Sequence, residues 1–261
     1  MQIQINSLFI GALFCYASSY AATHASKPSG QPSVSKQPSV SKAVLFENKN
    51  KTDKPDFTFE KKDTKNADGT TTQDSVFRYP DGRAAFTETL VLTADNKIVS
   101  YFYDQKQISQ RIWLAIDGKV IKLKKEWYEA EKVTKTQEEI EEYKENYYVG
   151  PQLQDVTLKR WASLTQGKNY KFKLIVMEHL DTFSFELEYD GMKDLNGKMV
   201  HRFSLYPRSF FIKLLVSPIR FFFENTPERK LLEVQGTLPV KPWNGKEWDG
   251  IFEGTMRPTY K

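Results

Sequence analysis

The side chains that could perform catalysis or bind a metal ion are few and scattered. The three histidines are His24, His179 and His201, and none of them stands with acidic residues at the spacing of a metal-ligand set. Glu186 and Glu188 form a pair of acids, but on an alternating strand their face normally meets water, so they do not indicate a glycosidase. The sequence has no nucleophile elbow, phosphate-binding loop or dinucleotide fingerprint. We therefore expect no catalytic residue, no metal ion and no cofactor, and interpret the chain as a binder rather than an enzyme.

Aromatic side chains are the clearest sign of a binding function. They make up 14% of the sequence and cluster late in it. Phe210 and Phe211 stand with Leu214 in the apolar segment Ser209–Val216, which as a helix would either fill the concave side of a sheet or cover an apolar pocket. The three phenylalanines at 221–223 cannot all face one core, because strand side chains alternate. The middle one is either covered by a helix or exposed to a ligand or a membrane.

Two charged residues share a strand face with apolar ones. Glu88 is in phase with Phe86 and Leu90, and Arg111 is in phase with Trp113. Such a charge is either paired within the protein or meets the polar end of a ligand. We add to these residues Trp161, from an expected helix, and the apolar residues of the segment Ser209–Val216. The candidate ligand-binding residues are therefore Trp161, Phe210, Phe211, Leu214, Trp113, Arg111 and Glu88.

The elements that must position these residues are mostly strands. Apolar and polar residues alternate over long runs, and turn signals recur about every ten residues, which is typical of an antiparallel meander. Ile108–Ile116 and Val120–Trp127, for example, are joined by the hairpin signal Asp117-Gly118. We expect about ten strands, several of them near 30 Å long at ~3.3 Å per residue, and long twisted strands curl. The predicted fold is mainly β: a long-stranded, antiparallel, curved sheet, or half-barrel, with two or three short helices across its concave side.

Three segments are expected to be these helices. Thr136–Tyr148 is rich in Glu and ends before Gly150-Pro151. Gln154–Leu164 has apolar residues at roughly helical spacing and a glycine shortly after its end. The third is Ser209–Val216. The last stretch, Pro239–Lys261, has tryptophans among Gly and Pro and is expected to form an irregular lid or edge cover.

The first residues predict export. The uncharged apolar run Leu8–Ala21 is too short to span a bilayer, and Ser19 and Ala21 suit the pocket of a signal peptidase. We expect residues 1–21 to be a cleaved signal peptide and the protein to be located in the periplasm. An uncleaved anchor, or lipidation at Cys15, is the alternative. Cleavage after Ala21 would remove the single cysteine and with it all disulfide and thiol chemistry.

A tether is expected between the signal peptide and the fold. Residues 22–43 contain the hexamer Gln-Pro-Ser-Val-Ser-Lys twice in succession and have no aromatic residue, so they cannot bury enough apolar area to become ordered. We expect them to form a disordered Ser/Pro/Lys tether, followed by a single β-rich domain over residues 44–261.

The charge of the chain argues against nucleic acid as a partner. The net charge is +5, from 38 basic and 33 acidic residues that are interspersed. Nucleic-acid binding would need a one-sided basic stripe with an aromatic platform, and neither is present.

Five short segments carry a resemblance to a known group of proteins: Trp161–Gly167, Tyr170–Phe172, Phe183–Phe185, Pro207–Phe211 and Ser217–Phe221. Over roughly residues 77–236 the chain resembles an uncharacterised family of exported proteins from Gram-negative bacteria. Its architecture is similar to the half-barrel of the periplasmic lipoprotein carriers (the LolA/LolB type) and of DUF3108-like proteins. The resemblance implies a curved antiparallel sheet with helices across its mouth and an apolar cavity between them. No functional residue of the carriers matches a position here.

These observations favour a periplasmic, non-catalytic binding protein for a hydrophobic small molecule, a lipid or an acyl chain. The alternative is a structural or interaction module of the cell envelope that has a filled core and an envelope protein as its partner. A ligand-sized apolar cavity would favour the first and a packed interior the second. The ligand, the partner and the oligomeric state are left open by the sequence.

Overall fold

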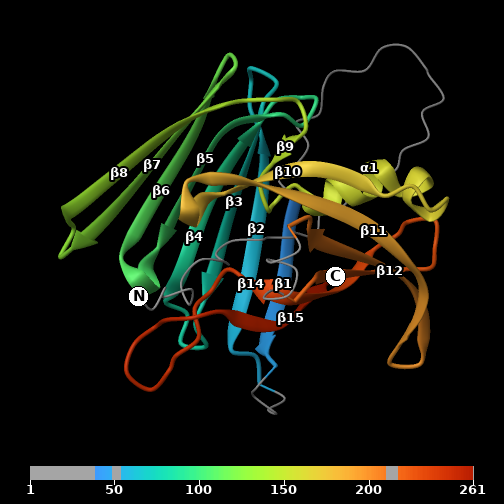
Figure 1. Cartoon of the computed structure of the whole chain (residues 1–261). Coiled ribbons are helices and arrows are strands. Elements are labelled where there is room, and N and C mark those ends of the chain that lie inside the picture. The colour runs from blue at the N-terminus through green and yellow to red at the C-terminus, as the bar shows by residue number, and fades with distance from the viewer. Residues whose placement is uncertain (1–38, 49–53, 210–216, 261) are drawn as a thin grey trace, which may run out of the picture.

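All strands that the structure describes belong to one sheet (Figure 1). The structure is a computed structural model that describes residues 39–48, 54–209 and 217–260. The fifteen strands follow the order β8-β7-β6-β5-β4-β3-β2-β1-β15-β14-β13-β12-β11-β10-β9. Neighbouring strands are antiparallel apart from β9 and β10, which are parallel over two residues.

The first half of the chain forms β1 (Ser39–Glu47), β2 (Phe57–Lys65), β3 (Thr71–Arg78), β4 (Ala84–Leu92), β5 (Ile98–Gln105), β6 (Gln110–Asp117), β7 (Val120–Glu129) and β8 (Lys132–Glu142). The second half forms β9 (Tyr147–Tyr148), β10 (Tyr170–Val176), β11 (Asp181–Leu195), β12 (Lys198–Pro207), β13 (Ile219–Glu224), β14 (Leu231–Leu238) and β15 (Phe252–Thr259). The helical elements are α1 (Leu153–Thr165) and the single 3₁₀ turns η1 (Lys106–Ile108) and η2 (Met177–His179).

The sheet curves without closing. Its two outer strands, β8 and β9, follow each other in the chain and do not pair within the described sheet. Contacts across the interior hold the curve instead: Lys125 Nζ of β7 donates to the carbonyl of Glu178 in η2 at 2.9 Å, and Gln152 Nε2 donates to the carbonyl of Asn96 at 2.8 Å. The prediction of a mainly β, curved antiparallel sheet is confirmed.

The inner face of the curve is the core. Strand residues of one phase are buried there, for example Phe59, Phe77, Phe86 and Leu114. Helix α1 lies beside β11 and buries Leu153, Val156, Trp161 and Leu164. The predicted helix Gln154–Leu164 is therefore confirmed as α1, one residue longer at each end.

The predicted helix Thr136–Tyr148 is wrong, because these residues form most of β8 and the short β9. A Glu-rich run of this length has a good helix propensity but is marginal as an isolated helix. The β7–β8 hairpin offers a ladder to β7 over the whole strand. Its β-branched Val133, Thr134 and Thr136 also suit a strand.

The ends of the fold also differ from expectation. Pro239–Lys261 is not wholly irregular, because it contains β15, which lies between β1 and β14. Residues 39–43, expected in the tether, belong to β1. Residues 1–38 and the core of the expected helix Ser209–Val216, residues 210–216, lie outside the described residues. None of the helices that the structure describes is long and apolar enough to cross a bilayer.

Candidate functional site

A row of polar side chains crosses the inner face of the sheet. Lys61 of β2 lies directly opposite Ser75 of β3. Ser75 in turn lies opposite Glu88 of β4, and Glu88 lies opposite Tyr103 of β5. All four are buried, with exposed fractions of 1%, 6%, 3% and 0% in this order. We call these four residues the polar row. The register of three hairpins aligns them, because directly opposed residues project to the same face.

A row of aromatic rings runs beside the polar row. Phe59, Phe77 and Phe86 stand two residues away from Lys61, Ser75 and Glu88 in their strands, so they share the inner face. They are also direct partners of one another, with ring centroids 4.8 Å and 5.5 Å apart. This part of the interior therefore has a polar line and an apolar line side by side.

Glu88 is a buried acid in an apolar setting. The hydroxyl of Tyr101 donates to its Oε2, whereas its Oε1 has no hydrogen-bond partner among the residues that the structure describes. Burial raises the pKa of Glu88 to about 8, and the bond from Tyr101 offsets part of that effect. At neutral pH the carboxyl group is therefore mostly protonated and can itself donate a hydrogen bond.

Tyr103 has the second unsatisfied oxygen of the polar row. Its ring packs 5.1 Å from Phe86, and its buried hydroxyl has no hydrogen-bond partner within the described part of the chain. Burial, with the nearby Glu178 and Glu88 as lesser causes, holds the pKa of this hydroxyl well above its usual value, so it stays a neutral donor. A buried polar atom without a partner costs roughly 1–3 kcal/mol.

Lys61 places a cation at the other end of the polar row. Its Nζ lies 3.4 Å from Oδ1 of Asp63, and its side chain is almost completely buried. A buried ammonium group needs such a partner. The row therefore combines an ammonium group, a hydroxyl, a protonated carboxyl and a phenol, most of which donate hydrogen bonds.

Of the predicted site residues that the structure describes, Glu88 alone lies in this row. Arg111 and Trp113 are on the outer face of β6. They alternate with Ile112 and Leu114, which are buried on the inner face. Arg111 is paired within the protein: it forms ion pairs with Glu131 and, at 3.7 Å, Asp104, and its guanidinium lies 4.2 Å from the centre of the Tyr128 ring.

Trp161 belongs to a different part of the core. Its ring lies 4.7 Å from Phe203 of β12 and 5.4 Å from Phe223 of β13, and the Arg229 guanidinium covers it at 4.6 Å. Phe210, Phe211 and Leu214 lie outside the described residues. The structure does not bring Trp161, Arg111, Trp113 and Glu88 together, because they contact separate strands and both faces of the sheet.

Two pockets open at the surface. One, of about 260 Å³, lies between the β4–β5 turn, the β8–β9 link and the polar side of α1, with Asp155, Lys159 and Arg160 in its wall. Beside it, Tyr148 and Tyr170 share a hydrogen bond of 3.0 Å between their hydroxyls. Helix α1 therefore does line a pocket, but with the face opposite to Trp161.

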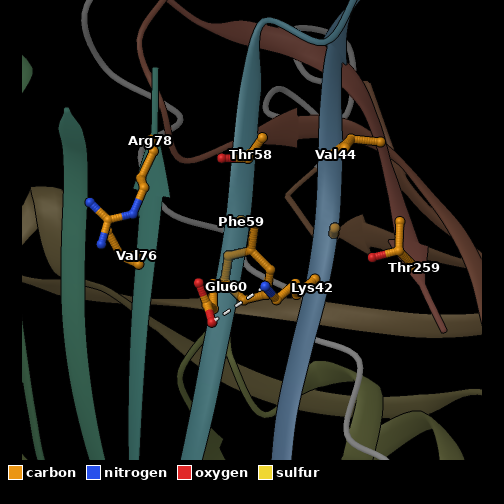
Figure 2. A pocket seen from close by; sticks show the side chains of 9 residues that line it. Lys42, Val44, Thr58, Phe59, Glu60, Val76, Arg78 and Thr259 are labelled. Carbon is orange, nitrogen blue, oxygen red and sulfur yellow. Dashed lines mark ion pairs between the residues drawn. The ribbon is translucent and has the colours of Figure 1, made fainter. Parts of the chain in front are cut away.

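The other pocket, of about 270 Å³, is a groove across β1, β2 and β3 (Figure 2). Val44 and Val76 line it together with Arg78 and with an ion pair of 3.8 Å between Lys42 and Glu60. This pair is half-exposed, and such pairs contribute about 0–1 kcal/mol. Neither groove includes a residue of the polar row.

Sequence reasoning missed Lys61, Ser75 and Tyr103. Strand alternation could have identified two of them, because residues two positions apart share a face. Lys61 follows Phe59 by two positions, and Ser75 precedes Phe77 by two. Among the described residues, no three or more His, Cys, Asp or Glu side chains gather in a way that could hold a metal ion.

Comparisons with known proteins give a structural likeness and no family. The structure is similar to the crystal structure of a beta-barrel-like protein of the domain of unknown function DUF1849 from Brucella abortus. The TM-score is 0.44 at 10% sequence identity, over 87% of this chain and 96% of that chain. No family model matches the sequence, and no curated protein matches it. The narrower resemblance to the lipoprotein carriers and DUF3108-like proteins stays a prediction.

Proposed function

We propose that this chain is a non-catalytic binding module of the Gram-negative periplasm that takes an amphipathic, lipid-like molecule inside its curved sheet. The observation that carries the proposal is the pair Glu88 and Tyr103. They are direct partners on β4 and β5, both are buried, and each has one oxygen without a hydrogen-bond partner in the described structure. The periplasmic location rests on the expected signal peptide.

The chemistry of the interior suits a molecule with an acceptor-rich polar end. The polar row offers the ammonium of Lys61, the protonated carboxyl of Glu88 and the phenol of Tyr103. A carboxylate or an ester group would accept these hydrogen bonds. The apolar part of such a molecule would contact the adjacent rings of Phe59, Phe77 and Phe86.

Entry of a ligand requires the inner side chains to part. Lys61, Glu88 and Tyr103 have at most 3% of their surface exposed. Binding is therefore expected to be slow, since an opening step must precede contact with the polar row.

The test uses the full chain purified from the envelope of a Gram-negative host. Native mass spectrometry should show a co-purified lipid, and a fluorescent fatty-acid probe should bind slowly and displace it. Glu88→Met and Tyr103→Phe should each raise the Kd about tenfold, as expected for the loss of one buried hydrogen bond. Glu60→Met, on the outer face of β2, is the matched control and should bind as the wild type does.

Two results would overturn the proposal. One is a folded wild-type protein that carries no lipid and takes up no probe. The other is unchanged probe binding in Glu88→Met and Tyr103→Phe. Tyr103→Phe is informative in either case, because deleting a hydroxyl that has no partner should leave the stability of the free protein unchanged or raise it.

A second candidate is the interaction module with a filled core. The close packing of the interior favours it, because Lys61, Glu88 and Tyr103 have at most 3% of their surface exposed. The aromatic rings of β12 and β13 and the guanidinium of Arg229 likewise enclose the ring of Trp161. In that case the polar row is a structural network that selects the register of β2 to β5. Its variants would then change stability and leave every binding property unaltered.

A further inference from the structure

Strand β8 is a long edge strand with one side unpaired. It spans the 11 residues Lys132–Glu142 and pairs with β7 alone in the described sheet. Every residue of β8 is exposed except Glu141, which is half-buried. Two of the few large apolar side chains on the surface, Val133 and Ile140, are 50% and 72% exposed there. Figure 1 shows β8 at the left margin of the molecule, away from α1. Such an edge is a template for another strand.

The charges of β8 are segregated along the strand. Lys132 and Lys135 lie in its first half, and Glu138, Glu139, Glu141 and Glu142 lie in its second half. Charges on an edge strand normally prevent unspecific pairing. In β8 the order of the charges favours one orientation of a second copy of the strand over the other. A parallel second copy would set lysines beside lysines and glutamates beside glutamates, whereas an antiparallel copy would set each lysine half against a glutamate half.

We propose that two copies of this chain pair through β8, antiparallel about a two-fold axis near Gln137. The lysines of each copy then face the glutamates of the other. In that register Lys132 of one copy lies opposite Glu142 of the other, and Lys135 lies opposite Glu139. The interface lies outside the polar row and goes beyond the proposed binding function. Because each copy has one β8, this isologous contact closes at two subunits.

The surroundings of β8 are compatible with this pairing. Glu142 has a partner in Lys144 at 3.0 Å, but both side chains are largely exposed, so the pair is weak and can be shared. Burial raises the pKa of the Glu141 carboxyl group, the neighbouring Asp181 adds to this effect, and Thr182 and Lys173 offset part of it. Glu138 and Glu139, beside it on the same strand, are exposed.

The first test measures mass by analytical ultracentrifugation of the full chain at low and high ionic strength. We expect a dimer that weakens with salt, because exposed ion pairs are screened. Lys132→Glu/Lys135→Glu should be a monomer, and so should Glu138→Lys/Glu139→Lys. Mixing these two variants should restore a dimer with one copy of each. Lys62→Glu/Lys198→Glu changes the net charge equally at exposed positions outside β8 and should dimerise as the wild type does.

The second test locates the two-fold axis. In a Cys15→Ser background, Gln137→Cys should form a disulfide-linked dimer under mild oxidation, because directly opposed residues of antiparallel strands have Cα atoms about 4.5–5.5 Å apart. Lys62→Cys in the same background should not. A wild-type monomer at millimolar concentration would overturn the proposal. So would a dimer in which Gln137→Cys links no better than Lys62→Cys, or a failure of the mixed variants to associate.

Discussion

Gln107 of η1 and Lys241, which follows β14 in the chain, exchange two hydrogen bonds. The amide N–H of Lys241 donates to Oε1 of Gln107 at 2.8 Å, and Nε2 of Gln107 donates to the carbonyl of Lys241 at 3.0 Å. Gln105 also donates to Oε1 of Gln107 at 3.0 Å. The side chain of Gln107 thus fixes the segment that follows β14. Its amide both accepts and donates a backbone hydrogen bond, as a residue of a paired strand does.

Replacing this glutamine should loosen that junction. Gln107→Leu leaves the amide and the carbonyl of Lys241 without these partners, and we expect a loss of about 1–3 kcal/mol in the free energy of unfolding. Urea denaturation measures the loss, and hydrogen exchange should show reduced protection at Lys241. Gln166→Leu, at the exposed end of α1, is the control and should change stability little. Equal effects at the two positions would contradict the role of Gln107.

Glu88 should make the protein less stable as pH rises. Its pKa is raised from 4.5 to about 8 in the folded protein, chiefly by burial. The associated stability is full below the unfolded pKa and is lost as pH rises toward the folded pKa, since the unfolded chain releases this proton first. Each unit corresponds to about 1.4 kcal/mol, so the effect is on the order of a few kcal/mol.

Glu88→Gln removes this dependence. Urea denaturation at pH 5 and pH 8.5 should show a smaller fall in stability for the variant than for the wild type, while Glu60→Gln should follow the wild type. Other titrating groups, such as His179, whose pKa is lowered first by burial, contribute equally to all three proteins. Parallel profiles for Glu88→Gln and the wild type would show that the acid is not buried as described.

The two tryptophans of the candidate site should differ in their importance for stability. Trp161 is 6% exposed, and we expect Trp161→Ala to cost about 3–5 kcal/mol. Trp113 is half-buried on the outer face, against Phe102 at 5.2 Å and Lys124 at 5.6 Å, so Trp113→Ala should cost clearly less. Guanidinium denaturation of both variants decides this, and the reverse order would contradict the assignment of the inner face.

Gly254 should be irreplaceable in the middle of the sheet. A Cβ atom at this position would overlap the carbonyl oxygen of Phe46 in β1 and the ring of Phe252. Gly254→Ala should therefore separate β1 from β15 locally and cost roughly 1–3 kcal/mol or more. Gly69→Ala, in a turn with φ of +83° and open space around it, tests the backbone effect alone and should cost less. Thermal unfolding of both variants measures the difference.

Much of the sheet could be predicted from alternation and turn residues. Asp117-Gly118 predicted the hairpin in which Asp117 does pair with Val120. The errors have physical causes. The glutamates of β8 indicated a helix because helix propensity depends on the residues of one segment alone. The hydrogen bonds between β7 and β8, which override this propensity, depend on both strands and are not visible in either one. In β15 the glycine and proline indicated an irregular segment, although Phe252 and Met256 alternate with exposed residues.

The candidate site was less predictable because it depends on register. Glu88 was found since its phase within one strand is visible in the sequence. The row that it forms with Lys61, Ser75 and Tyr103 depends on the register of four neighbouring strands. A shift of one residue in any of the three hairpins would move these side chains out of line. For Arg111 and Trp113 the difficulty was the face: both faces of β6 carry large apolar side chains, so phase alone does not tell inside from outside.

The position of β15 delays the completion of this sheet until the last of its strands in sequence order is available. β15 lies between β1 and β14, so the meander β1–β8 and the strands β9–β14 have no backbone ladder between them in the described sheet until residues 252–259 are available. A chain in which β15 is not yet in place therefore holds two half-sheets with open edges, each prone to recruit a foreign strand. The pairing of β1 with β15 also joins segments far apart in sequence, which slows folding. Strand β15 therefore decides whether the described strands form one sheet or two.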